Sequence, residues 1–182
     1  MTAYSHRAVL LASAALLSAM LAAAPSYAMG SSGGGGISGP TGTSESDRLR
    51  AQYKKAVKAV EAKDFATAEA LLADYVTKKK KSADAWNYLA FSRRNLGKND
   101  EAMANYNTAL ELDDEHKGAL EYQGELHLKL GNVAAAQANL AKLEKLCRKK
   151  CEERDVLQAA IERTKDGKTS WIAPERAGRE SN

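Results

Sequence analysis

The stretch ADAWNYLAFSRRNLGKNDEAMANYNTALELD, from Ala83 to Asp113, decides the fold of this chain. It reads as two helices joined by a turn at Gly97. Large and small residues alternate in it at positions 4, 7, 8, 15, 20, 24, 27 and 30 of a unit that begins at Ala83: Trp86, Leu89, Ala90, Gly97, Ala102, Tyr106, Ala109 and Leu112. Small side chains at Ala90 and Ala102 let the two helices cross closely, and the bulky ones fill the space on either side.

The same spacing recurs 34 residues later and 34 residues earlier. The later unit repeats the small, turn, small and large residues, at Gly124, Gly131, Ala136 and Leu140, although Gln123 and His127 stand where apolar residues are usual. The earlier unit keeps an apolar stripe of helical period, at Leu49, Tyr53, Ala56, Val57 and Val60. We therefore predict three units, at about 49–82, 83–116 and 117–150.

These residues, in this register, resemble the tetratricopeptide repeat (TPR), a helix–turn–helix unit of 34 residues. The resemblance implies an all-α fold: a right-handed α-solenoid of three hairpins, because one unit cannot bury its apolar faces alone. A further helix at about 152–165 has one apolar stripe and is expected to cap the stack. The repeat positions are packing determinants, and we expect Trp86 to be largely buried.

The ends of the chain differ in composition from the predicted TPR domain at 47–166. Residues 1–28 resemble a signal peptide, because an uncharged apolar run precedes the small residues Ser26 and Ala28. Cleavage after Ala28 would give an exported, periplasmic protein with no stable membrane insertion; an uncleaved anchor is the alternative. Residues 29–46 read as a Gly/Ser-rich flexible linker and 167–182 as a flexible tail.

The charge of the chain indicates no nucleic-acid partner. The formal net charge is only +4, from 27 Lys and Arg against 23 Asp and Glu, which is mild beside the basic patches of nucleic-acid-binding domains. The run Lys78–Lys81 is the one dense cluster. It falls at a predicted helix C-terminus, where cations favour the helix dipole, and an acidic partner or an anionic lipid remains an alternative reading.

Cys147 and Cys151 are the only cysteines, and three residues of a predicted turn separate them. In an exported protein a disulfide is the expected state of such a pair. Thiol–disulfide exchange is the alternative, although a thioredoxin-like site would have two intervening residues beside a βαβ pattern. Two cysteines with the scattered His116 and His127 are weak grounds for zinc, so we predict neither metal nor cofactor.

The resemblance to TPR proteins implies binding of a protein or peptide in a concave groove lined by the first helix of each unit. Carried onto this sequence, positions 5, 9 and 12 of the second unit and 5 and 9 of the third give the candidate partner-binding residues: Asn87, Phe91, Arg94, Glu121 and Glu125. Asn87 would bond a peptide backbone, Phe91 would be an apolar anchor, and Arg94 would bind a carboxylate.

No Ser/His/Asp set, phosphate-binding loop or metal-ligand spacing appears, so the sequence predicts a non-enzymatic binding or scaffold protein. A thiol-redox factor using Cys147 and Cys151 is the alternative. Association of copies through the ends of the stack is left open.

Overall fold

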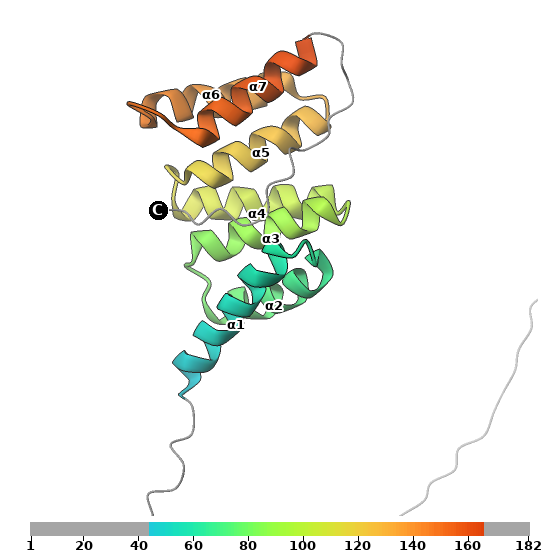
Figure 1. Cartoon of the computed structure of the whole chain (residues 1–182), viewed down its shortest axis with the longest axis vertical. Helices are drawn as coiled ribbons and strands as arrows, with labels where there is room; N and C mark the ends of the chain where they lie inside the picture. The colour runs from blue at the N-terminus through green and yellow to red at the C-terminus, as the bar shows by residue number, and fades with distance from the viewer. Residues whose placement is uncertain (1–43, 166–182) are drawn as a thin grey trace, which may run out of the picture. The chain divides into compact units, whose positions relative to one another are not determined.

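A computed structural model describes residues 44–165, which form seven α-helices and no β-strand within that range (Figure 1). The helices are α1 (Glu45–Glu61), α2 (Phe65–Lys78), α3 (Ala83–Asn95), α4 (Asn99–Leu112), α5 (Lys117–Lys129), α6 (Val133–Leu146) and α7 (Glu152–Lys165). The predicted signal peptide, all but the end of the predicted linker and the predicted tail lie outside the described residues.

Polar side chains set where most of the helices begin. Ser44 accepts a hydrogen bond from the backbone N–H of Asp47 at 3.2 Å, so α1 begins at Glu45 and takes in the last two residues of the predicted linker. The caps that act in the same way on α2, α3, α5 and α6 are Asp64, Ser82, His116 and Asn132.

The turn inside each hairpin uses one residue in the left-handed region. These residues are spaced by the repeat period: Lys63 with φ of 60°, Gly97 with 81° and Gly131 with 78°. Glycine adopts that conformation without strain, whereas lysine carries a Cβ that opposes it. The turn glycines predicted from the sequence are therefore required by the backbone, and Lys63 is the departure from the pattern.

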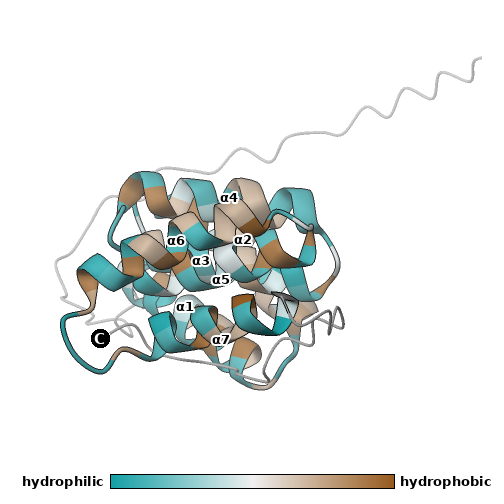
Figure 2. Ribbon diagram, turned by 90° about the horizontal axis from the view of Figure 1, so that it is seen from above, coloured by the Kyte–Doolittle hydropathy of each residue, from teal (hydrophilic) through white to brown (hydrophobic). Residues whose placement is uncertain are grey.

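The helices stack as antiparallel pairs in two layers. The pairs are α1 with α2, α3 with α4 and α5 with α6, and α7 packs against both α5 and α6. Seen from above, α2 and α4 lie toward one side of the stack and α1 and α7 toward the other (Figure 2). Apolar side chains fill the space between the layers in two clusters, one centred on the first two hairpins and one on α5, α6 and α7.

The predicted repeat positions are buried, with one exception. Leu89, Ala90, Ala102, Tyr106, Ala109 and Ala136 are all at most 1 % exposed. At Gly124, an added Cβ would lie 2.6 Å from Cδ2 of Leu157, so the missing side chain lets α7 approach α5 closely. The prediction for Trp86 was wrong: it is only partly buried, because its indole N–H reaches out to donate to the carbonyl of Lys80 at 2.9 Å.

The polar Gln123, which replaces an apolar residue of the repeat pattern, has partners inside the stack. Its Nε2 donates to Oδ1 of Asn107 at 2.7 Å, and its Oε1 accepts from Nδ2 of Asn139 at 2.9 Å. These bonds link α4, α5 and α6 and satisfy a buried amide. Between residues 44 and 165, no helix has the length and apolar character that a membrane span requires.

Candidate functional site

The five candidate partner-binding residues lie on the first helices of the second and third hairpins, and we call the surface that they define the helix-A face. Asn87, Phe91 and Arg94 lie on one side of α3, since steps of four and three residues return to the same side of a helix. Glu121 and Glu125 are related in the same way on α5. The five are buried, with exposed fractions between 1 and 6 %. The expectation that Asn87 and Arg94 lie outside the core was wrong.

Arg94 already has a carboxylate partner within the chain. Its Nη1 donates to Oε2 of Glu125 at 2.6 Å and to the backbone carbonyl of Tyr122 at 3.3 Å. Burial works to lower the pKa of Arg94, but Tyr106 and Glu125 outweigh it and the pKa is raised. Arg94 therefore joins α3 to α5, and the predicted role of binding a partner's carboxylate does not fit this geometry.

Two aromatic rings enclose the same guanidinium. The Arg94 Cζ lies 5.1 Å from the centre of the Phe91 ring and 5.4 Å from that of Tyr122. The two rings are 4.8 Å apart, and Phe91 also contacts Phe65 across 5.8 Å. Because a cation over a desolvated ring is stabilised by up to about 2 kcal/mol, this arrangement adds rigidity to the helix-A face.

Asn87 has an unused acceptor. Its Oδ1 is buried and has no hydrogen-bond partner, while the side chain as a whole is 5 % exposed. The Asn87 amide lies against Gly118 of α5, where an added Cβ would be 3.4 Å from Nδ2. A buried carbonyl oxygen without a donor costs about 1–3 kcal/mol, so this atom is where the face is ready to accept an N–H.

His116 and Asp84 fix the two helix starts that border Asn87. Nδ1 of His116 accepts the backbone N–H of Ala119 at 3.1 Å, so a neutral ring carries its hydrogen on Nε2. That nitrogen lies 3.0 Å from Oδ1 of Asp84 on α3. With Asp84, Glu121 and Glu125 against the single Arg94, carboxylates outnumber cations among these side chains.

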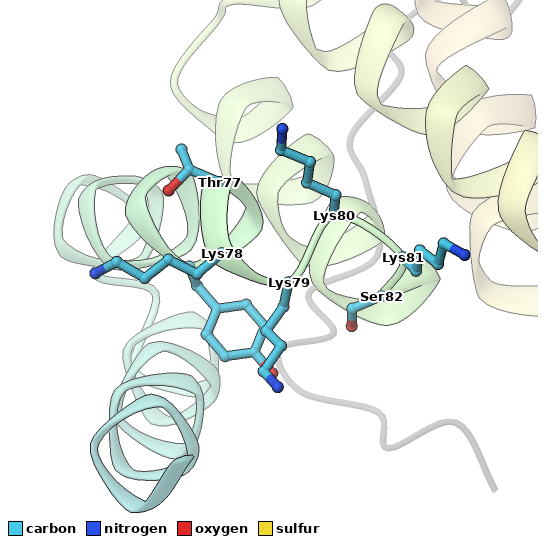
Figure 3. Close-up of a pocket in the computed structure, with 7 residues that line it drawn as sticks. Thr77, Lys78, Lys79, Lys80, Lys81 and Ser82 are labelled. Carbon is cyan, nitrogen blue, oxygen red and sulfur yellow. The ribbon is translucent and has the colours of Figure 1, made fainter. Parts of the chain in front are cut away.

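The lysine run forms the rim of a separate, open pocket of about 500 Å³ (Figure 3). The lining residues run from the end of α2 into the following loop: Tyr75, Thr77, Lys78, Lys79, Lys80, Lys81 and Ser82. Lys78 pairs with Asp74 at 2.9 Å. The lysines are exposed, as expected of a solvated helix end, and no buried polar group points into the pocket.

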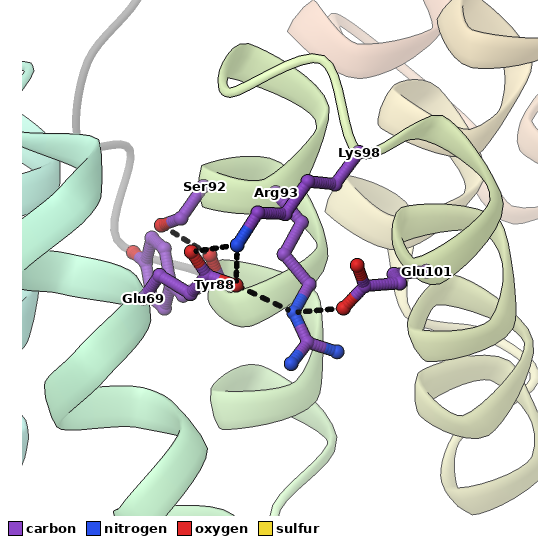
Figure 4. A network of polar contacts seen from close by, with 6 residues as sticks. All are labelled: Glu69, Tyr88, Ser92, Arg93, Lys98 and Glu101. Atoms are coloured by element: carbon purple, nitrogen blue, oxygen red, sulfur yellow. Dashed lines mark hydrogen bonds and ion pairs between the residues drawn. The ribbon is translucent and has the colours of Figure 1, made fainter. Parts of the chain in front are cut away.

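A charged network joins the first hairpin to the second on the side of α2 and α4 (Figure 4). Glu69 on α2 accepts from Nζ of Lys98 at 2.8 Å and from Nε of Arg93 at 3.1 Å. The hydrogen bond from Lys98 lowers the pKa of Glu69 against the effect of partial burial, and Arg93 lowers it further. Arg93 also reaches Glu101, at 3.4 Å, so the network positions three helices rather than a ligand.

Cys147 and Cys151 form a disulfide in the turn between α6 and α7, with Cα atoms 5.7 Å apart. Each cysteine is 7 % exposed. No group of three or more potential metal ligands is found among residues 44–165.

Comparison of the sequence with protein-family models and with curated proteins gives no match. Solved structures do match. The Yersinia enterocolitica type III secretion chaperone SycD, in complex with a peptide of the translocator YopD, has a TM-score of 0.59 at 19 % identity, covering 67 % of this chain and 95 % of that one. PcrH with the chaperone-binding region of PopD gives 0.61 at 18 % identity, covering 68 % and 96 %.

A third match is the first TPR of Spaghetti (RPAP3), bound to the HSP90 peptide SRMEEVD, with a TM-score of 0.58 at 15 % identity and coverage of 68 % and 98 %. The fold is the tetratricopeptide repeat. The all-α solenoid of three TPR hairpins with a capping helix is thus confirmed. At these identities the matches establish the fold alone.

The TPR register explains what the sequence reading missed on the helix-A face. Arg94 holds position 12 of one unit and Glu125 holds position 9 of the next, and these positions lie side by side on neighbouring first helices. Opposite charges at the two positions are the signal that could have revealed the pair. The unused acceptor of Asn87 had no such signal, because it depends on which donors the surrounding side chains fail to supply.

Proposed function

We propose that this protein is a non-enzymatic TPR module that holds an extended segment of a protein partner on the helix-A face. The observation that carries the proposal is the buried, unpaired Oδ1 of Asn87. The peptide complexes named for SycD, PcrH and Spaghetti support the class of ligand. Since TPR folds serve many partners, the site and not the fold must identify this one.

In this proposal Asn87 recognises the backbone of the partner. A peptide N–H donates to Oδ1, which removes the cost of the unpaired acceptor, and Nδ2 can donate to a peptide carbonyl in return. Arg94 does not bind the partner's carboxylate. Held by Glu125 and by the rings of Phe91 and Tyr122, it keeps α3 and α5 in a fixed relation beside Asn87.

The cysteine pair fits a structural role better than thiol exchange. Exchange requires a sulfur that an attacking thiolate can reach, and Cys147 and Cys151 are each 7 % exposed. Counting free thiols in the native protein with and without mild reductant tests this: a stable disulfide gives none until the protein unfolds. Rapid reduction of the folded protein would favour the redox alternative.

We further propose that the protein is exported to the periplasm and begins at Met29 after cleavage. The motivation is the apolar run followed by Ser26 and Ala28. The mass of the intact protein from the cell envelope tests it. Retention of residues 1–28 would mean an uncleaved anchor.

The binding proposal is tested with a library of random peptides displayed on phage, selected against the full chain. Selected peptides should lose at least about tenfold in affinity, or about 1.4 kcal/mol, on Asn87→Ala. The matched control is Asn105→Ala: Asn105 lies on α4, is 6 % exposed and also has an unpaired buried amide atom. Equal affinities for the two variants would place binding on another surface.

A further inference from the structure

We propose that the C-terminal segment of this chain, residues 166–182, itself docks on the helix-A face and competes with external peptides for it. The inference rests on the proposed function, because it assigns a regulator to the same face. The segment, DGKTSWIAPERAGRESN, is the part of the chain that follows α7.

The first argument is the burial of α5. Nine of its 13 residues are buried, including Glu121 and Glu125, although the helix is not apolar on every side. Their side chains on the helix-A face are only 1 and 2 % exposed. Carboxylates are rarely buried to this degree unless they meet donors or cations. A face of this kind suits a segment that supplies both.

The second argument is chemical complementarity. The segment carries the apolar pair Trp171 and Ile172, followed by Arg176 and Arg179. The helix-A face offers the aromatic rings of Phe91 and Tyr122, and its carboxylates outnumber Arg94. Trp171 would add to the aromatic contacts, and the two arginines would meet carboxylates with charge-assisted hydrogen bonds.

The third argument is reach and direction. The helices alternate in direction along the stack, so α3, α5 and α7 run parallel, and α7 packs directly on α5. The segment therefore leaves α7 on the side where α3 and α5 end, near Arg94. Seventeen residues span up to about 60 Å, whereas α3 is about 20 Å long and neighbouring helices lie about 10 Å apart.

A segment that returns along α3 and α5 meets their residues in a defined order. Trp171 would come first, beside Phe91 and Arg94. Arg176 and Arg179 would follow, toward Asp84 and Glu121 near the helix starts. The order of residues in the segment therefore matches the order of groups on the face.

Tethering makes even a weak contact effective. A short flexible link gives an effective concentration of about 1 mM. If the isolated segment binds with a Kd of about 100 µM, the face is free in roughly one molecule in eleven, and an external peptide binds about tenfold more weakly.

The test uses a fluorescent synthetic peptide of residues 166–182, measured by anisotropy against the full chain and against a chain that ends at Lys165. We expect binding to the shortened chain and at least fivefold weaker binding to the full chain. A peptide with Trp171→Ala and Arg176→Ala should fail to bind. If the shortened chain does not fold, the full chain carrying Trp171→Ala, Arg176→Ala and Arg179→Ala takes its place and should bind the unmodified peptide as tightly as predicted for the shortened chain.

Three results would overturn the inference. The first is no binding of the 166–182 peptide to either protein while a phage-selected peptide still binds, which leaves the proposed function intact. The second is equal affinity for the full and shortened chains, which excludes occupation in cis. The third is a difference that grows with protein concentration, which would mean that the segment reaches a second copy. Failure of both the 166–182 peptide and every selected peptide would refute the proposed function as well.

Discussion

Replacing Arg94 by methionine should destabilise the fold more than any other single charge removal on α3. Methionine keeps most of the side-chain length but leaves Glu125, which is 2 % exposed, without its ion pair at 2.6 Å. Removing one partner of a buried pair typically costs about 3–5 kcal/mol, because the other charge stays buried and uncompensated. Loss of the contacts with Phe91 and Tyr122 acts in the same direction.

The assay is urea unfolding followed by circular dichroism on the full chain. A cost of about 3–5 kcal/mol is a large share of the 5–15 kcal/mol that holds a typical domain together. The matched control is Arg93→Met, one residue earlier on the same helix. Arg93 is 21 % exposed and pairs with Glu69 and Glu101, so its removal should cost only about 1 kcal/mol.

A second variant separates the charge from the packing. Combining Arg94→Met with Glu125→Leu removes both charges and should recover much of the lost stability, since an apolar pair of similar volume often replaces a buried ion pair at little cost. The reasoning is refuted if Arg94→Met costs no more than Arg93→Met, or if the double variant loses the sum of the two single changes.

Three further predictions concern other parts of the stack. Lys63→Gly should stabilise the protein by about 0.5–1 kcal/mol by relieving a left-handed residue, and an unchanged or lower melting temperature would contradict it. Gly124→Ala should destabilise by about 1–2 kcal/mol because its Cβ meets Leu157, but should be neutral or stabilising in a Leu157→Ala background; additive effects in the double-mutant cycle would exclude that contact. The Glu69 pKa is lowered in the fold, so its contribution is present above its unfolded pKa near 4.5 and lost as the pH falls through the folded value: Glu69→Gln should lower the melting temperature at pH 7 but hardly at pH 3, and an equal loss at both would disprove the linkage.

The sequence was sufficient for the fold because the repeat pattern records backbone and packing constraints. Gly97 and Gly131 mark turns that need a positive φ, and the small residues mark close helix crossings. Such constraints act within one hairpin and recur at a fixed period. Three hairpins and a capping helix therefore followed from spacing alone.

The helix-A face was predicted less well because burial depends on neighbouring units. Reading Arg94 by its own position suggests an exposed cation, whereas Glu125 of the next unit buries it. Trp86 shows the converse: its position predicts a core residue, but the Lys80 carbonyl draws the indole N–H to the edge. Pairwise readings across units would recover the first case and not the second.

The most direct test of peptide binding on the helix-A face is nuclear magnetic resonance of the isotope-labelled full chain during titration with a phage-selected peptide. The side-chain amide signals of Asn87 should shift to saturation, and intermolecular contacts should appear to Phe91 and Tyr122, while the amide of Asn105 stays unchanged. Contacts to α2 or α4, or to the Lys78–Lys81 loop, with Asn87 unaffected would contradict the proposed site.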